Sequence, residues 1–194
     1  MRIRIPSRRK WAPLLVMFAV AGSLLSATAG TVQAETSRDR ASSSARLIDF
    51  YEFRPRHADR MCLDVAHASV AHAADVVQGT CWGGTNQHWQ WIQVAAGVYE
   101  IRAQHSDMCL DVAHASPAHG ANVVQGRCTS GNNQHWRFID QGNGFFELRP
   151  AHTNNKCLDV AHASTAHGAD VIQANCSRGT NQQWRRLYVG TWTD

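Results

Sequence analysis

The 194-residue chain has no apolar run long enough to cross a membrane comfortably. Its most apolar stretch, from Trp11 to about Leu25, is short and is interrupted by Pro13, Gly22 and Ser23. No window shows the apolar periodicity of an amphipathic helix. A membrane span and a helical fold are therefore not expected.

The first 34 residues contain no acidic side chain. Five of the first ten residues are basic, the apolar stretch follows, and the segment ends in small residues that include Val32-Gln33-Ala34. This pattern predicts a secretory signal peptide over residues 1–34 that is cleaved after Ala34, with Ala27-Thr28-Ala29 as the second choice of site. The sequence thus predicts a secreted, extracellular protein.

The rest of the chain lacks an excess of positive charge. The predicted leader holds five of the 19 Lys and Arg residues and none of the 15 Asp and Glu, which leaves 14 basic against 15 acidic side chains. Nucleic acid is therefore not an expected partner. Residues 35–46 are polar and predict a disordered linker, and residues 47–194 predict one domain.

The domain is dominated by a stretch that occurs three times. The octet C-L-D-V-A-H-A-S begins at Cys62, Cys109 and Cys157, at spacings of 109 − 62 = 47 and 157 − 109 = 48 residues. A fixed period of this size is typical of repeat architectures. We place the repeats at about 47–94, 95–141 and 142–190.

Cysteine occurs only inside the repeats, twice in each, at an identical separation of 19 residues. An even cysteine count in an exported chain indicates disulfides. The equal spacing favours three bonds within the repeats: Cys62–Cys81, Cys109–Cys128 and Cys157–Cys176.

Each repeat contains four short stretches with strand character. The first repeat shows them at Tyr51–Arg54, Cys62–Val65, Asp75–Val77 and Trp89–Ile92. Three units of four strands are best closed as a barrel with pseudo-threefold symmetry, because closure removes exposed edges. The expected fold is all-β, a β-trefoil.

A Gln-x-Trp element closes each repeat, at Gln87-His88-Trp89, Gln134-His135-Trp136 and Gln182-Gln183-Trp184. Three such elements in phase with three cysteine pairs resemble the ricin B-type lectins, also called carbohydrate-binding module family 13. The resemblance covers roughly residues 47–189. It implies that each repeat can hold one sugar in a shallow pocket.

The resemblance also implies the sugar-binding side chains. An Asp after the first cysteine would accept hydrogen bonds from sugar hydroxyls, an Asn would add an amide, and a Gln would help to hold the Asp. These residues are Asp64, Asn86 and Gln87 in the first repeat, Asp111, Asn133 and Gln134 in the second, and Asp159, Asn181 and Gln182 in the third. The alternative for each is a structural role in a turn.

The aromatic ring that stacks on the sugar in that family has no counterpart here. Gly79, Gly126 and Ala174 occupy its place, or Thr80, Arg127 and Asn175 after a shift of one residue. Two features could compensate. Trp82 follows a cysteine in the first repeat only, and the loop histidines His67, His114 and His162 each follow the Asp by three residues.

Catalysis is not expected, because a threefold repeated Asp gives equivalent sites, whereas a glycosidase needs two carboxylates in different environments. No Gly-x-Ser-x-Gly elbow or phosphate-binding loop occurs. The sequence thus predicts a monomeric glycan-binding protein without a cofactor. The alternatives are a β-trefoil that binds protein instead of sugar and a metal-binding surface protein that uses loop histidines such as His162 and His167.

Overall fold

A computed structural model describes residues 46–193; the predicted leader and nearly all of the predicted linker lie outside this range. The strands are β1 (Leu47–Pro55), β2 (Met61–Val65), β3 (Ala74–Thr80), β4 (Trp89–Ala95), β5 (Val98–Ala103), β6 (Cys109–Val112), β7 (Ala121–Gly126), β8 (His135–Gly142), β9 (Phe145–Pro150), β10 (Lys156–Val160), β11 (Ala169–Asn175) and β12 (Trp184–Thr193). Four 3₁₀ turns connect them: η1 (Ala66–Ala68), η2 (Ala113–Ala115), η3 (Ala161–Ala163) and η4 (Thr180–Gln182). Over residues 46–193, no helix has the length and apolar character that a membrane span requires.

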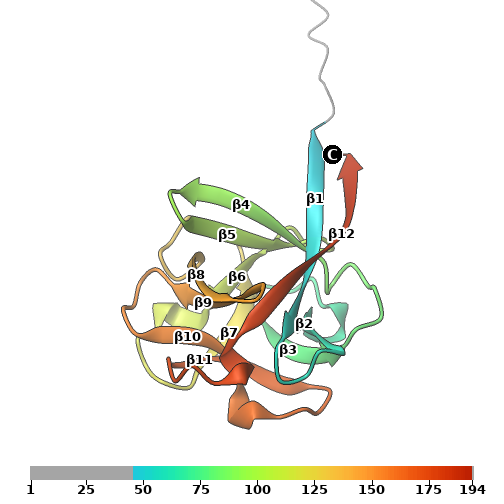
Figure 1. Ribbon diagram of the computed structural model, residues 1–194. Helices are drawn as coiled ribbons and strands as arrows, with labels where there is room; N and C mark the ends of the chain where they lie inside the picture. The colour runs from blue at the N-terminus through green and yellow to red at the C-terminus, as the bar shows by residue number, and fades with distance from the viewer. Residues whose placement is uncertain (1–45, 194) are drawn as a thin grey trace, which may run out of the picture. The chain divides into compact units, whose positions relative to one another are not determined.

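Six strands close into a barrel. Strand β1 pairs with β12 and β4, β5 pairs with β4 and β8, and β9 pairs with β8 and β12, always antiparallel. The longest pairing joins the first strand to the last and runs from Leu47 opposite Thr193 to Pro55 opposite Trp184. In Figure 1, β1 and β12 lie side by side as a ribbon that reaches beyond the barrel strands.

The other six strands form three hairpins, β2–β3, β6–β7 and β10–β11. The second strands of these hairpins, β3, β7 and β11, also pair with one another. This arrangement confirms the predicted β-trefoil of three four-stranded units. The three disulfides also form as the spacing predicted: Cys62–Cys81, Cys109–Cys128 and Cys157–Cys176. Such bonds indicate an oxidising compartment.

The tryptophans of the Gln-x-Trp elements are at the centre of the core. Trp89, Trp136 and Trp184 are fully buried. Each indole N–H donates to the carbonyl of the leucine that follows the first cysteine of its repeat, for example Trp89 to Leu63 at 2.9 Å. A buried indole needs such a partner, and the bond fixes the strand after the element against the strand that carries the Asp.

A buried glutamine joins each repeat to the loop of another. The Nε2 of Gln78, on β3, donates to the carbonyls of Ser164 at 2.9 Å and Ala166 at 3.0 Å in the third repeat. Gln125 binds the equivalent carbonyls of the first repeat, and Gln173 those of the second. The loops after η1, η2 and η3 are thus held by a neighbouring repeat in cyclic order.

Candidate functional site

Each predicted Asp lies on the first strand of a hairpin and is held by the amides predicted to accompany it. In the first repeat, the Nδ2 of Asn86 donates to Asp64 Oδ1 at 2.7 Å, and the Nε2 of Gln87 donates to Asp64 Oδ2 at 2.5 Å. Asp64 is only 6% exposed. The sequence therefore brings together the three side chains that the resemblance grouped.

The second and third repeats reproduce this arrangement. Asp111 accepts from Asn133 and Gln134, at 2.6 Å in both bonds. Asp159 accepts from Gln182 at 2.6 Å and from Asn181 at 3.1 Å, the longest Asn–Asp bond of the three. Three carboxylates are thus oriented in the same way by local amides.

The hydrogen bonds inside the cluster determine which atoms remain for a ligand. Gln87 is fully buried, its Nε2 also donates to the carbonyl of Thr80, and its Oε1 accepts from the backbone N–H of Trp82. The second N–H of Asn86 is directed to the carbonyl of Val65. The Gln amide is thus fully used inside the cluster, and the acceptors left without a partner there are the second lone pairs of the carboxylate oxygens and the carbonyl oxygen of the Asn.

Burial raises the pKa of Asp64 and of Asp159 above the ordinary range, because desolvation disfavours the charged carboxylate. Hydrogen bonds from the Gln and Asn of the same repeat oppose this effect, as does positive charge on nearby histidines. Asp64 and Asp159 are therefore carboxylates that water stabilises poorly, and this favours hydrogen bonds from the hydroxyl groups of a ligand.

A hollow of about 560 Å³ opens beside Asp64. It is lined by Asp64, Ala66, His67, Ala68, Asp75, Val77, Trp82, Asn86, His167 and Gly168. Trp82 is 68% exposed, and its ring lies directly over Gly84, where a Cβ atom would collide with it. The tryptophan thus offers an open ring at the edge of a hollow with polar and apolar walls, and its backbone is fixed by the same Gln that holds the Asp.

A second hollow, of about 490 Å³, lies beside Asp159. Its lining includes His162, Asn181 and Gln182 from the predicted set, together with His119 and Ile172. In the second and third repeats the place of Trp82 is taken by Thr129 and Ser177, whose hydroxyls approach the Gln Oε1 at 3.2 Å. The exposed ring is therefore special to the first repeat.

Each of the two hollows is lined by residues from two different repeats, and the sequence repeats did not reveal this. The backbone N–H of Thr80 donates to His167 Nδ1 at 3.1 Å, so that a histidine of the third repeat lines the site of the first. Equivalent bonds join Arg127 to His72 at 3.3 Å and Asn175 to His119 at 3.1 Å. The predicted His67 and His162 also line these hollows, so two histidines from different repeats face one site.

The missing family ring has a structural reason in the first two repeats. Gly79 and Gly126 lie so close to the Asp that a Cβ atom at either position would collide with the carboxylate Oδ2 of Asp64 or Asp111. The third repeat carries Ala174 at this place. The carboxylates of the first two repeats thus lie over the backbone of the residue that takes the ring's place.

An aliphatic side chain lies directly opposite each Asp, and sequence reasoning did not identify it. Asp64 is paired with Val77, Asp111 with Val124 and Asp159 with Ile172. Paired residues of adjacent antiparallel strands share one face of the sheet. The sequence contained a signal for this pairing. The constant spacing of the two cysteines sets the register of the hairpin in each repeat, and this register places the aliphatic residue opposite the Asp. These side chains supply an apolar surface beside the carboxylate.

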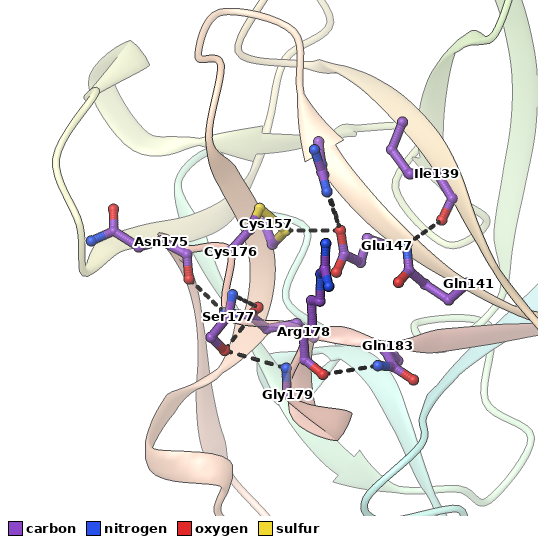
Figure 2. A network of polar contacts seen from close by, with 12 residues as sticks. Ile139, Gln141, Glu147, Cys157, Asn175, Cys176, Ser177, Arg178, Gly179 and Gln183 are labelled. Atoms are coloured by element: carbon purple, nitrogen blue, oxygen red, sulfur yellow. Dashed lines mark hydrogen bonds and ion pairs between the residues drawn. A yellow bond between two sulfur atoms is a disulfide. The ribbon is translucent and has the colours of Figure 1, made fainter.

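The turn that carries the third Asn is fixed from two sides. The Cys157–Cys176 disulfide precedes it, and Cys157 Sγ lies 3.5 Å from the buried carboxylate of Glu147, as Figure 2 shows. On the other side, the Nε2 of Gln183 donates to the carbonyl of Arg178 at 3.0 Å. This bracing holds the backbone from Ser177 to Asn181 in place beside the hollow.

Candidate metal ligands do not gather at the loop histidines. Within residues 46–193, the groups of three or more close ligand atoms are a glutamate with a cysteine pair in each repeat. Because these sulfurs are bonded in disulfides, they offer no thiolate. His162 and His167, the pair considered for zinc or copper, line different hollows.

A family model described as a ricin-type beta-trefoil lectin domain-like family matches residues 46–126, 85–174 and 132–193. Among solved structures, the designed threefold symmetric protein ThreeFoil is 43% identical, with a TM-score of 0.70, over 72% of this chain and 99% of that chain. An exo-beta-1,3-galactanase from Clostridium thermocellum is 33% identical with a TM-score of 0.70, but the match covers 73% of this chain and only 30% of the galactanase.

The ricin B-like lectin of Macrolepiota procera, solved with lactose, is 18% identical with a TM-score of 0.62, over 71% of this chain and 94% of the lectin, and shows the shared fold alone. No curated protein matches the chain in sequence. The matches of the family model together span all of the described residues. On this evidence, the chain belongs to the family of ricin-type β-trefoil lectin-like domains.

Proposed function

We propose that this is a secreted carbohydrate-binding protein that recognises polysaccharide or glycan through up to three shallow sites, and that the site of the first repeat is the strongest. The observation that carries the proposal is the hollow beside Asp64, where an oriented carboxylate, an apolar Val77 and the exposed ring of Trp82 meet. Sugars present vicinal hydroxyls and an apolar C–H face, and these groups match that set of side chains.

The geometry supports separate roles for the residues. Asp64, Asp111 and Asp159 accept hydroxyl hydrogen bonds through the lone pairs that the amides leave unused. Trp82 stacks on the sugar ring in the first repeat, while Val77 and Ile172 give the first and third sites an apolar floor. His67 and His167 flank the first site, and Gln87 keeps the Asp and the Trp82 backbone in place.

Such open and shallow sites bind a single sugar weakly. Tethering three sites on one rigid barrel raises the apparent affinity for a polymer or a cell surface by as much as about 10²–10⁴-fold where the geometry allows simultaneous contact. The threefold repetition of one arrangement fits multivalent binding and argues against catalysis, which needs carboxylates in different environments.

The deciding experiment is a glycan and polysaccharide array with the oxidised mature chain, residues 35–194, with and without EDTA. We expect binding to one sugar class that EDTA does not change. The combined change Asp64→Ala, Asp111→Ala and Asp159→Ala should abolish that binding, and Asp59→Ala, at an exposed position outside the hollows, is the matched control.

Circular dichroism and thermal unfolding establish that the triple variant is folded. Binding that survives the triple change would refute the assignment of the sites. If the folded, oxidised protein binds no glycan on the array, the alternative of a β-trefoil that binds protein is favoured. Loss of binding in EDTA, restored by zinc or copper, would favour the histidine metal site.

A further inference from the structure

A second set of side chains lies on the barrel strands, apart from the hairpins that carry Asp64, Asp111 and Asp159. Trp91, Phe138 and Arg186 each follow the tryptophan of a Gln-x-Trp element by two residues. They pair with Ile101, Leu148 and Phe53, respectively, which are fully buried in the core. The three repeats therefore place two aromatic rings and one guanidinium at equivalent positions of the barrel.

These three side chains converge. The rings of Trp91 and Phe138 are stacked, with centroids 3.7 Å apart and an interplanar angle of 25°. The guanidinium carbon of Arg186 lies 3.7 Å from the centroid of Trp91 and 4.4 Å from that of Tyr51. An arginine thus takes the place where the other two repeats carry a ring, and cation–π contacts hold it there.

The donors of Arg186 are not used by the part of the chain that the structure describes. Among residues 46–193, Arg186 has no carboxylate within 4.0 Å, and its side chain donates no hydrogen bond, in contrast to Arg54, Arg102 and Arg149, which pair with glutamates of their own strands. Arg186 is an exposed residue of β12, so a ligand can reach its guanidinium from solvent. An accessible guanidinium without a counterion is free to pair with an anionic group of a ligand.

Hollows adjoin this arginine. One, of about 350 Å³, is lined by Trp91, Phe138, Asp140, Gly144, Phe145, Phe146 and Arg186. The other, of about 290 Å³, is also lined by Trp91 and Arg186 and adds Arg46, Asp49 and Gln93. The Trp91–Arg186 pair is therefore common to the walls of both.

The chemistry of the lining restricts the ligand. The guanidinium presents a fork of N–H donors that matches a carboxylate in a bidentate manner. Both faces of Trp91 are covered, by Phe138 and by Arg186, so the rings of Phe145 and Phe146 in the first of these hollows are the ones that suit the apolar face of a sugar ring. Asp140 uses Oδ1 to accept from the backbone N–H of Gly142 at 2.8 Å, and its second oxygen can accept a hydroxyl. A purely apolar ligand would leave these polar groups without partners.

We propose that this barrel surface is a binding site for a carboxylate-bearing saccharide, a uronic acid residue, with Arg186 as the residue that selects the carboxylate. The site uses none of the residues of the proposed sugar sites in the hairpins. It would allow the protein to distinguish acidic from neutral polysaccharides.

The test uses the oxidised mature chain and a matched pair of probes, methyl glucuronide and its methyl ester, in which one added methyl group removes the charge of the carboxylate. Binding is measured by titration calorimetry and by NMR chemical shift changes of the tryptophan indoles. We expect the free acid to bind and the ester to bind at least about tenfold more weakly, because charge-assisted hydrogen bonds are lost.

Arg186→Met keeps an unbranched apolar stem without the charged guanidinium, and Arg186→Lys keeps the charge without the planar fork. We expect the first variant to lose acid binding and the second to weaken it by about tenfold. Arg185→Met, at the neighbouring position of β12, is the control and should leave binding unchanged. Thermal unfolding checks that the variants are folded. If Arg186→Met does not fold, Arg186→Lys still tests the proposal.

Equal binding of acid and ester, absence of binding, or binding that survives both changes at Arg186 would overturn the proposal. The proposal is also overturned if sedimentation shows that the wild-type chain is a dimer and that the Arg186→Met variant is a monomer. The surface would then bind a second copy of the chain. Acid binding should persist in the triple Asp→Ala variant of the hairpin sites. Failure of the two proposals can thus be told apart.

Discussion

Gly79 and Gly126 show how much of the site depends on single positions. A Cβ atom at either residue would collide with the carboxylate of Asp64 or Asp111 as it lies in this structure. The third repeat, with Ala174 at this place, still lets Asp159 accept from two amides, but its bond to Asn181 is longer, at 3.1 Å. The same small residues remove the family's stacking ring. The exposed apolar surface of the first site is therefore provided by Trp82 and Val77, which come from the turn after the disulfide and from the strand opposite the Asp.

Trp82→Ala should weaken saccharide binding to the first repeat without destabilising the fold, because the ring is largely exposed. Loss of an aromatic contact worth about 0.5–1.5 kcal/mol lowers the affinity by roughly two- to thirteenfold. Titration of the protein with its array-selected sugar measures the effect, and Thr129→Ala, at the equivalent position of the second repeat, is the matched control. An unchanged affinity would remove Trp82 from the site.

The raised pKa values of Asp64 and Asp159 predict how binding depends on pH. Because the carboxylates are the acceptors, binding at the first and third sites should be intact at neutral pH and lost as the pH falls through the raised pKa values, above the usual value of about 3.9. The fold should not lose stability from these groups over that range, since protonation relieves the cost of burying their charge. Calorimetric titrations between pH 7 and 4 would measure the loss of binding.

Asp64→Asn provides the control for this pH dependence, because its amide does not titrate. The variant should bind more weakly at neutral pH, and the pH dependence that remains should come from the other repeats. Full affinity of the wild-type chain down to pH 3 would show that the carboxylates are not the sugar acceptors.

At the scale of elements, the strands and the disulfides could be predicted because their signals are local and repeated three times. Alternation of apolar and polar residues indicates strands, and equal cysteine spacing indicates equivalent bonds. The role of His167 at the first site could not be predicted in this way. It depends on how the third repeat meets the first when the trefoil closes, and identical local sequences carry no information about which neighbour a loop contacts.

The buried glutamines that join the repeats lead to a prediction about stability. Gln78→Ala removes two hydrogen bonds and leaves the carbonyls of Ser164 and Ala166 without these donors, which should lower the free energy of unfolding by about 1–3 kcal/mol. Denaturant unfolding measures this change. Gln93→Ala, at an exposed position of β4, should have little effect. If Gln78→Ala and Gln93→Ala are equally stable, the hydrogen bonds of Gln78 to the third repeat do not contribute to the free energy of unfolding.

For the whole molecule, the disulfides should be a main source of stability. Each closes a loop of about 20 residues, and the chain-entropy model assigns such a loop roughly 3 kcal/mol. The double change Cys109→Ala and Cys128→Ala should therefore lower the midpoint of thermal unfolding markedly while the other two bonds form. Calorimetry of the oxidised variant checks this. A midpoint equal to that of the wild-type chain would mean that the barrel core alone supplies the stability.

The pairing of β1 with β12 also has a kinetic consequence. The partner of Leu47 is Thr193, so the longest ladder of the barrel joins residues at opposite ends of the described sequence. Contacts between such distant segments slow folding, because a large loop must close before they form. A nascent chain that has released only two repeats has no partner for most of β1. The barrel can close only after synthesis reaches β12, whereas the local hairpins β2–β3 and β6–β7 have both of their strands earlier.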